Sequence, residues 1–122
     1  MANRILIVDD DPKSQVLLRD LLKANGYATL EACDGKQAVE MAKREKPDLI
    51  LMDYHMPVLN GLEATRLIKT DDETRDIPVI FVTSSAMKGD EDKIYASGCE
   101  AYISKPFDIH KLLGMIAKFV GL

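Results

Sequence analysis

Acidic, hydroxyl and basic side chains follow four apolar runs of the sequence, at the point where each run ends. Three aspartates, Asp9–Asp11, come directly after the first run, and Asp53 closes the third. Thr83 closes the fourth run, and Lys105 follows the last one. If these runs are parallel strands of one sheet, their carboxyl ends meet at one edge, where ligands of such sheets bind. Two or three carboxylates, a hydroxyl and an ammonium group would then converge.

Such a cluster of carboxylates is electrostatically unfavourable without a counter-charge. Two carboxylates about 4 Å apart repel each other by about 4 kcal/mol at an effective dielectric constant of 20. The cluster must therefore take up a proton or recruit a cation. Oxygen ligands at an open edge suit Mg²⁺, which binds one or two carboxylates together with a phosphate. A softer metal would need His or Cys ligands, and neither residue type is placed for it.

Mg²⁺ beside Asp53 suggests a reaction in which this carboxylate attacks a phosphoryl group. The ion and Lys105 would neutralise the charge on the equatorial phosphoryl oxygens. Thr83 could donate a hydroxyl hydrogen bond to the same group. The residue types at the strand ends therefore predict an aspartate that accepts a phosphoryl group.

Five strand-like runs alternate with helical patterns, and these elements must position the polar residues. The alternation predicts a parallel sheet covered by helices on both faces, an α/β fold. The first, third and fourth runs are almost continuously apolar, as in strands buried on both faces. The second alternates and the fifth is short, so both suit sheet edges. A doubly wound five-stranded sheet of order 2-1-3-4-5 fits, although other orders with the same edges stay open. The predicted strands are Arg4–Asp9, Tyr27–Ala32, Leu49–Asp53, Pro78–Thr83 and Ala101–Ser104.

Helices are predicted between these strands from capping residues and apolar spacing. Asp11 caps the first helix and Pro12 suits its first turn. Asn60 opens the third and Asp108 opens the fifth. The second and fourth helices are predicted at Asp34–Arg44 and Lys88–Ser97. The residues predicted to face the core are Val16, Leu17, Leu21 and Ala24; Ala38, Val39 and Ala42; Leu62, Leu67 and Ile68; and Ile109, Leu112, Leu113, Ile116, Ala117 and Val120.

Length and composition exclude several classes of protein. The 122 residues suffice for one domain, predicted to span 1–122. A formal net charge of −4 lacks the basic surface of a nucleic-acid-binding protein. No apolar run approaches the roughly 20 residues of a membrane span and no secretory signal is evident, so a cytoplasmic location is expected. Cys33 and Cys99 form no Cys-x-x-Cys motif, and two reduced, packed cysteines are expected.

Five short motifs follow one another along the chain. They are Ile7–Asp11, Leu51–Pro57, Asn60–Gly61, Val82–Ser84 and Tyr102–Phe107. In this order and spacing they resemble, over the whole chain, the receiver domain of bacterial two-component response regulators, which has a flavodoxin-like, CheY-like fold. Residues 86–92 and 98–106 are particularly similar to single-domain regulators of this family, which points to cell-cycle or polarity signalling.

The resemblance implies a phosphoacceptor and a metal site. Asp53 would accept a phosphoryl group from a phosphohistidine of a sensor histidine kinase or a histidine phosphotransfer protein. Asp10 and Asp53 would bind Mg²⁺ through their side chains and Asp9 through water. The backbone carbonyl of His55 would complete the metal site. Such a domain is not an enzyme, but it assists its own phosphorylation and dephosphorylation.

The resemblance also implies a switch. Thr83 and Lys105 would bind the phosphoryl oxygens. Tyr102 occupies the position of the switch aromatic, which turns inward when Thr83 moves toward the phosphate. A receiver of this kind signals by changing its affinity for a downstream protein effector, without contacting nucleic acid or a membrane directly. A monomer or a weak dimer is expected.

A partner surface is predicted on the fourth helix, the fifth strand and the fifth helix. Tyr95 and Tyr102 would lie on it, together with Met115 and Phe119, which are neighbours on one helix face. We expect this surface to bind the effector in the phosphorylated state. The alternative is that Met115 and Phe119 simply flank the core.

Three other functions compete with a phosphorylation switch. An unphosphorylated pseudo-receiver would be an interaction module of the same fold, but such modules usually lack some of the acids, Thr83 or Lys105. A hydrolase of the haloacid-dehalogenase kind needs an acid two residues after its nucleophile, where this chain has His55. A flavin protein needs a phosphate-binding loop of Ser, Thr and Gly after the first strand, where three acids stand instead.

Overall fold

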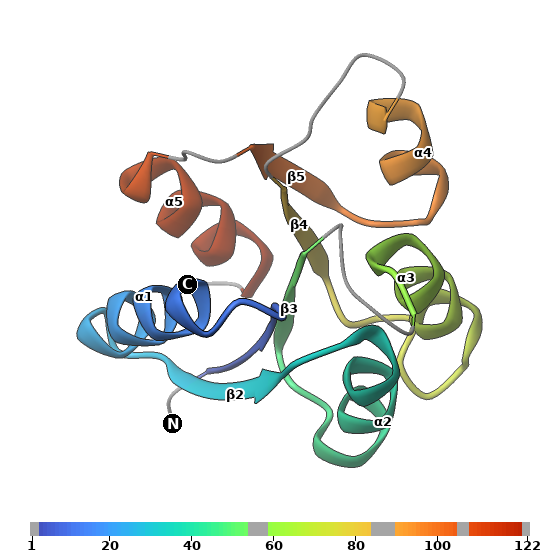
Figure 1. The fold of residues 1–122 in the computed structure, drawn as a ribbon, viewed down its shortest axis with the longest axis horizontal. Coiled ribbons are helices and arrows are strands. Elements are labelled where there is room, and N and C mark those ends of the chain that lie inside the picture. The colour runs from blue at the N-terminus through green and yellow to red at the C-terminus, as the bar shows by residue number, and fades with distance from the viewer. Residues whose placement is uncertain (1–2, 54–58, 84–89, 105–107, 121–122) are drawn as a thin grey trace.

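The computed structural model describes residues 3–53, 59–83, 90–104 and 108–120. In this part of the chain, five parallel strands alternate with five helices (Figure 1). The strand order is β2-β1-β3-β4-β5, so the predicted doubly wound fold and its strand order are confirmed. The elements are β1 Arg4–Val8, α1 Pro12–Ala24, β2 Ala28–Ala32, α2 Gly35–Glu45, β3 Leu49–Asp53, α3 Gly61–Thr70, β4 Val79–Thr83, α4 Asp90–Ala96, β5 Ala101–Ser104 and α5 Ile109–Val120.

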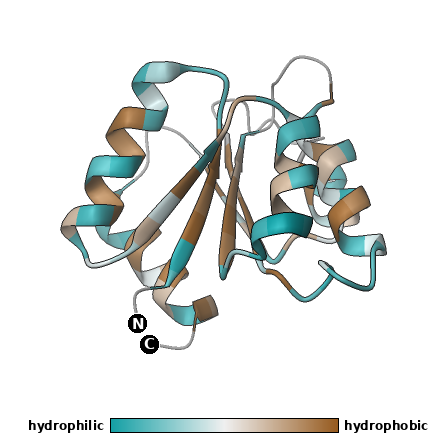
Figure 2. Ribbon diagram, turned by 90° about the horizontal axis from the view of Figure 1, so that it is seen from below, coloured by the Kyte–Doolittle hydropathy of each residue, from teal (hydrophilic) through white to brown (hydrophobic). Residues whose placement is uncertain are grey.

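The sheet separates two hydrophobic cores, because alternate residues of each strand point to opposite faces. Helices α1 and α5 cover one face, and α2, α3 and α4 cover the other (Figure 1). Ile5 and Ile7 of β1 pack toward α1 and α5, whereas Leu6 and Val8 pack toward the opposite helices. Figure 2 shows apolar residues concentrated along the central strands. β1 and β3 are therefore held rigidly from both sides, which fixes the positions of the residues at their ends.

Capping aspartate and asparagine side chains begin the helices where the sequence predicts. Asp11 accepts a hydrogen bond from the Lys13 backbone N–H at 3.0 Å, and Asn60 accepts one from that of Glu63 at 3.0 Å. Asp108 does the same at the start of α5. These bonds satisfy N–H groups that the first turn leaves unpaired. The observed strand ends lie within one residue of the predicted ones.

The predicted inward face of α1 is confirmed for Leu21, which packs partly buried against the core, and is wrong for its other three residues. Val16 and Leu17 are 44% and 61% exposed, and Ala24 is also exposed. Leu18 and Leu22 are the buried residues of this helix. Three successive apolar residues, 16 to 18, start the pattern, so its spacing fits more than one rotation of the helix about its axis. The structure turns the helix so that two apolar side chains face solvent.

Most other inward positions are confirmed. Ala38 and Ala42 of α2 are fully buried, as are Leu112 and Ile116 of α5. The exceptions are Leu67 and Ile109, which are about half exposed. Leu67 lies at the edge of the apolar face of α3, and Ile109 is the first residue of α5, two positions where spacing alone does not determine burial.

A polar network at the amino ends of the strands fixes where β4 and β5 begin. The Lys69 ammonium donates to the carbonyl of Ile77 at 2.6 Å and to that of Arg75 at 3.1 Å. It also pairs with Glu100 at 2.8 Å, and the other oxygen of Glu100 accepts from the Val79 N–H at 2.8 Å. Because Lys69 belongs to α3, this network ties that helix to both strands.

The two cysteines differ in their surroundings. Cys99 is buried and donates to the Ile94 carbonyl at 3.2 Å. Burial, together with the nearby charge of Glu100, raises the pKa of its thiol to about 11. Cys33 is exposed at the end of β2, so the prediction of two packed cysteines is wrong for this residue. Neither cysteine forms a disulfide.

A membrane-spanning helix needs about 20 predominantly apolar residues. None of the helices in residues 3–53, 59–83, 90–104 and 108–120 is long and apolar enough to cross a bilayer.

A close approach of backbones fixes α3 against the end of β3. A Cβ atom at Gly61 would lie 2.2 Å from the carbonyl oxygen of Asp53 and 2.9 Å from the ring of Phe81. Only glycine leaves room for this contact. The first residue of α3 thus abuts the strand residue whose side chain is a candidate for chemistry.

Gly61→Ala is predicted to lower the free energy of unfolding by about 2–3 kcal/mol, because the added methyl group must displace the Asp53 backbone or Phe81. Gly114→Ala is the matched control. A Cβ at this exposed position of α5 would meet nothing within 4 Å, so the change should stabilise the helix by about 0.5–1 kcal/mol. Urea unfolding curves measure both effects. Equal stability of Gly61→Ala and the parent would contradict the close approach.

Candidate functional site

The strand register brings three aspartates together at the carboxyl edge of the sheet. Val8 of β1 lies opposite Met52 of β3, so Asp9 and Asp53 follow at the next step of adjacent strands. Asp10 comes directly after Asp9. Carboxylate oxygens of these three residues all lie within 4.8 Å of one another. The predicted convergence of Asp9, Asp10 and Asp53 is therefore observed.

The three carboxylates differ in their access to water. Asp9 is only 2% exposed, Asp53 is partly buried and Asp10 is exposed. The Asp9 carboxylate accepts a hydrogen bond from the Asp11 backbone N–H at 2.9 Å. At 4.8 Å and an effective dielectric constant of 20, each pair of ionised carboxylates repels by roughly 3 kcal/mol. The cluster thus forms a negative site with one buried and one open side.

The cluster fits a hard divalent cation. All of its donor atoms are carboxylate oxygens, which are the ligands that Mg²⁺ prefers. The exposed side at Asp10 leaves space for the water molecules that Mg²⁺ usually keeps. Among the described residues, the only group that meets the geometric requirement for a metal site is this one, and it contains neither histidine nor cysteine. A soft metal is therefore a poor fit.

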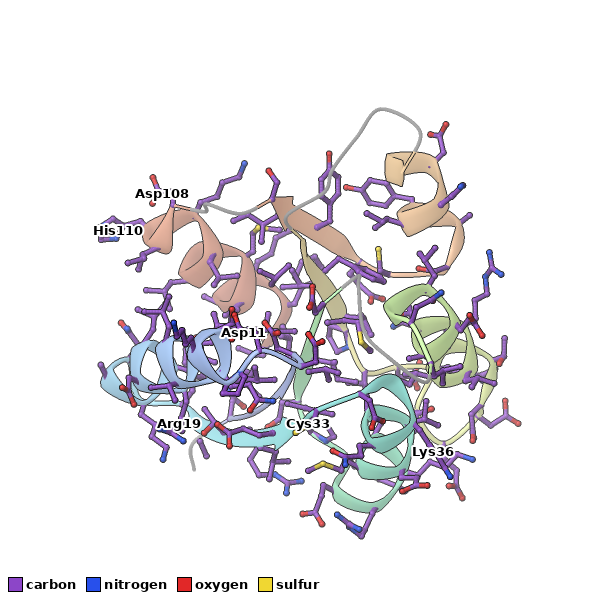
Figure 3. The ribbon with its side chains drawn as sticks, viewed as in Figure 1. Asp11, Arg19, Cys33, Lys36, Asp108 and His110 are labelled. Carbon is purple, nitrogen blue, oxygen red and sulfur yellow. The ribbon has the colours of Figure 1, made fainter. Side chains whose placement is uncertain are left out.

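The neighbouring loop ends carry further candidate residues. Figure 3 shows Asp11 at the start of α1 and Cys33 directly after β2. Asp11 is confirmed as a helix cap. Thr83 ends β4 opposite Ser104 of β5, so its backbone reaches the same edge, but its side chain lies outside the description. His55 and Lys105 also lie outside the described residues.

The predicted partner surface is only partly assembled. The rings of Tyr95 and Tyr102 meet edge to face, with centroids 5.7 Å apart. Tyr95 is 50% exposed and Tyr102 is half-buried. Met115 and Phe119 instead pack, partly buried, against the core between α5 and the sheet. Their placement agrees with the alternative that these two residues flank the core.

Two residues to which the motifs assigned no role also shape the site. Gly61 allows α3 to touch the end of β3, and Gln15 of α1 donates side-chain hydrogen bonds to backbone carbonyls beneath the cluster. A sequence signal for Gln15 exists. It lies three residues before Leu18 and seven before Leu22, so this amide shares the inward side of α1 with the two buried leucines.

Comparison with known proteins identifies the family. The family model described as "Response regulator receiver domain" matches residues 5–117. The chain belongs to the response regulator receiver family. This confirms the family predicted from the five motifs and makes the protein a two-component signalling domain.

Response regulators from the bacterial genus Brucella align with nearly the whole chain. The polar-differentiation response regulator DivK of Brucella anthropi is 46% identical over 121 residues, which is 99% of this chain and 98% of that protein. DivK of Brucella melitensis gives the same identity and coverage. DivK is the single-domain regulator that residues 86–92 and 98–106 resemble, and these relatives confirm the resemblance.

Solved receiver structures share the fold. The receiver domain of a sensor histidine kinase from Pseudomonas aeruginosa PAO1 is 35% identical, with a TM-score of 0.93 and full coverage of both chains. That structure has a magnesium ion coordinated in its active site cleft. The response regulator domain of Thermotoga maritima CheB is 31% identical, with a TM-score of 0.87, and the match covers 100% of this chain and 98% of that one.

Asp10→Asn is predicted to raise the free energy of unfolding of the metal-free receiver domain by about 1 kcal/mol, because one repulsive charge is removed and Asp10 is screened by solvent. With saturating Mg²⁺ the order should reverse, since the parent binds the ion more tightly. Urea unfolding with and without Mg²⁺ measures both effects.

Asp76→Asn is the control for this measurement. It removes the same charge from an exposed position outside the cluster and should change stability little in either condition. A metal-free Asp10→Asn variant that is less stable than the parent would show that the carboxylates do not crowd one another.

Proposed function

We propose that this receiver domain is a phosphorylation switch and that Asp53 is its phosphoacceptor. The observation that carries the proposal is the placement of Asp53, which is partly exposed at the end of central strand β3 with Asp9 and Asp10 beside it. The phosphoryl donor is a phosphohistidine on a sensor histidine kinase or a histidine phosphotransfer protein. Membership of the receiver family supports this donor class.

Phosphoryl transfer requires an unprotonated carboxylate and neutralised phosphoryl oxygens. A Mg²⁺ ion, when bound, supplies positive charge for the phosphoryl oxygens. Asp10 and Asp53 would hold this ion through their side chains and Asp9 through water, and the carbonyl of His55 would complete the ligand set. A carboxylate oxygen of Asp53 attacks phosphorus, a P–O bond forms, and the P–N bond to the donor imidazole breaks. The magnesium in the related Pseudomonas receiver, together with the carboxylate donors here, supports this assignment.

Two further residues of the proposed site contact the phosphoryl group rather than the ion. Thr83, at the end of β4, donates a hydroxyl hydrogen bond to one phosphoryl oxygen. Lys105, which directly follows β5, pairs with another. Both strands end at the edge of the sheet that carries Asp53, and this shared edge supports the assignment.

The exposed apolar side of α1 provides a contact surface for the donor protein. Val16 and Leu17 face solvent on the helix that begins two residues after Asp10. They line a shallow hollow together with Pro12, Lys13 and Asp20. A donor helix seated on this hollow would bring its phosphohistidine close to the carboxylate edge, and burying two apolar side chains would stabilise the encounter.

The output of the switch is a changed affinity for a downstream protein effector. Phosphorylation of Asp53 draws Thr83 toward the phosphoryl group, and Tyr102 turns inward into the space that this leaves. The edge-to-face contact with Tyr95 would then break, which changes the surface of α4 and β5. The 46% identity to DivK supports a role in cell-cycle or polarity signalling.

The phosphorylation experiment uses acetyl phosphate as a small-molecule donor and intact mass as the readout. The parent should gain one phosphoryl group only in the presence of Mg²⁺, and Asp53→Asn should gain none. Asp92→Asn, at an exposed position of α4, serves as the control and should behave like the parent. Failure of the parent both to gain mass and to bind beryllofluoride, a stable phosphoryl mimic, would favour the pseudo-receiver alternative.

The switch makes a separate prediction for the two tyrosines. Nuclear Overhauser effects between the rings of Tyr95 and Tyr102 should be present in the free protein, since the centroids are 5.7 Å apart. They should weaken or vanish with Mg²⁺ and beryllofluoride, and persist under the same conditions in Asp53→Asn. Unchanged effects in an activated parent would contradict an inward turn of Tyr102.

A further inference from the structure

Gln15 places a side-chain amide between the ends of two strands. It belongs to α1, one turn after the Asp11 cap, and it is half-buried on the side of the helix that faces the sheet. Its Nε2 atom donates to the carbonyl oxygen of Asp9 at 2.5 Å and to that of Ala32 at 2.9 Å. Both N–H groups of the amide are used, so the two bonds fix its orientation.

These bonds close a small ring around the Asp9 backbone. The N–H of Asp9 donates to the Ala32 carbonyl at 3.1 Å, and the same carbonyl accepts from Gln15. The carbonyl of Asp9 also accepts from Gln15, so both backbone polar groups of this residue are held. The Asp9 carboxylate in turn accepts from the Asp11 N–H. Rotation of the Asp9–Asp11 turn would break bonds in this ring.

The end of β2 is held by a second glutamine. Gln37 of α2 accepts a hydrogen bond from the Cys33 backbone N–H at 2.9 Å through its Oε1 atom. Ala32, which receives the Gln15 amide, is the residue immediately before this bond. The acceptor carbonyl for Gln15 is therefore itself supported from the other face of the sheet, and it offers a fixed point to which the Asp9 backbone is tied.

We propose that Gln15 is a positioning residue for the cation site, which holds the Asp9 and Asp10 backbone where their carboxylates converge with Asp53. The inference rests on the proposed function, because it concerns the Mg²⁺ that phosphoryl transfer requires. Gln15 acts through the carbonyl of Asp9 and does not itself bind the ion. Groups that orient metal ligands from outside the ligand set typically affect metal affinity by 10- to 100-fold when they are replaced.

Two substitutions separate positioning from charge. Gln15→Met keeps the length of the side chain and removes its donors. Gln15→Glu also removes them and adds a negative charge near the cluster, which by electrostatics alone would attract Mg²⁺ more strongly. Loss of positioning predicts about tenfold weaker Mg²⁺ binding for both variants. An effect of charge alone predicts tighter binding for Gln15→Glu.

Arg19→Met provides the matched control. Arg19 lies on the same helix, on the side toward β2 (Figure 3), and pairs with Glu31 of that strand at 3.5 Å. Its replacement removes a contact between α1 and β2, as the Gln15 variants do, but leaves the Asp9 carbonyl untouched. The Mg²⁺ dissociation constant of Arg19→Met should stay within twofold of the parent value.

Magnesium titrations followed by ¹H–¹⁵N spectra give the dissociation constants, at a temperature where urea curves show every variant to be folded. Weaker binding by both Gln15 variants, with Arg19→Met unchanged, supports the proposal. Binding within twofold of the parent by either Gln15 variant, tighter binding by Gln15→Glu, or an equal loss in Arg19→Met overturns it while leaving the phosphorylation switch intact. A parent that does not bind Mg²⁺ overturns both the positioning role and the proposed function.

Discussion

Mutual repulsion of three carboxylates at one sheet edge is the constraint around which this domain is built. β1 and β3 are adjacent, and their register forces Asp9 and Asp53 onto neighbouring positions. Asp9 is almost fully buried there, where repulsion is least screened. Two buried strands with a core on each face resist the separation that would relieve it. Folding therefore supplies the free energy that keeps a strongly negative, cation-seeking site assembled.

The framework of this site could be predicted from sequence because it depends on patterns that are local in the chain. Continuous apolar runs identify the central strands, and Asp11 and Asn60 mark helix starts through short-range hydrogen bonds. The convergence of Asp9 and Asp53 follows from topology alone, since parallel strands end at one edge. The predicted roles of Thr83 and Lys105 follow from their side-chain chemistry at strand ends and from the resemblance to the receiver family.

Features that depend on contacts between distant segments could not be predicted in this way. α1 is rotated so that Val16 and Leu17 face solvent, although the spacing of its apolar residues is equally compatible with these two residues facing the core. Gly61 is required because α3 touches a strand carbonyl, and no pattern of residue types encodes that distance. The bonds of Gln15 join a helix to two strands, so they exist only in the folded chain.

Helix α1 carries two features on opposite sides of a single turn. The side of α1 that faces the sheet carries the Gln15 amide, which donates a hydrogen bond to the Asp9 carbonyl. The outer side carries the exposed apolar residues Val16 and Leu17. A protein that shifts α1 when it docks must lengthen or shorten the hydrogen bonds of the Gln15 side chain. It would thereby alter the affinity of the site for the cation. Thermodynamic reciprocity then requires the ion to change the affinity for the docked protein by the same factor. Docking of the donor protein on α1 and binding of the cation beside the phosphoacceptor would thus be cooperative.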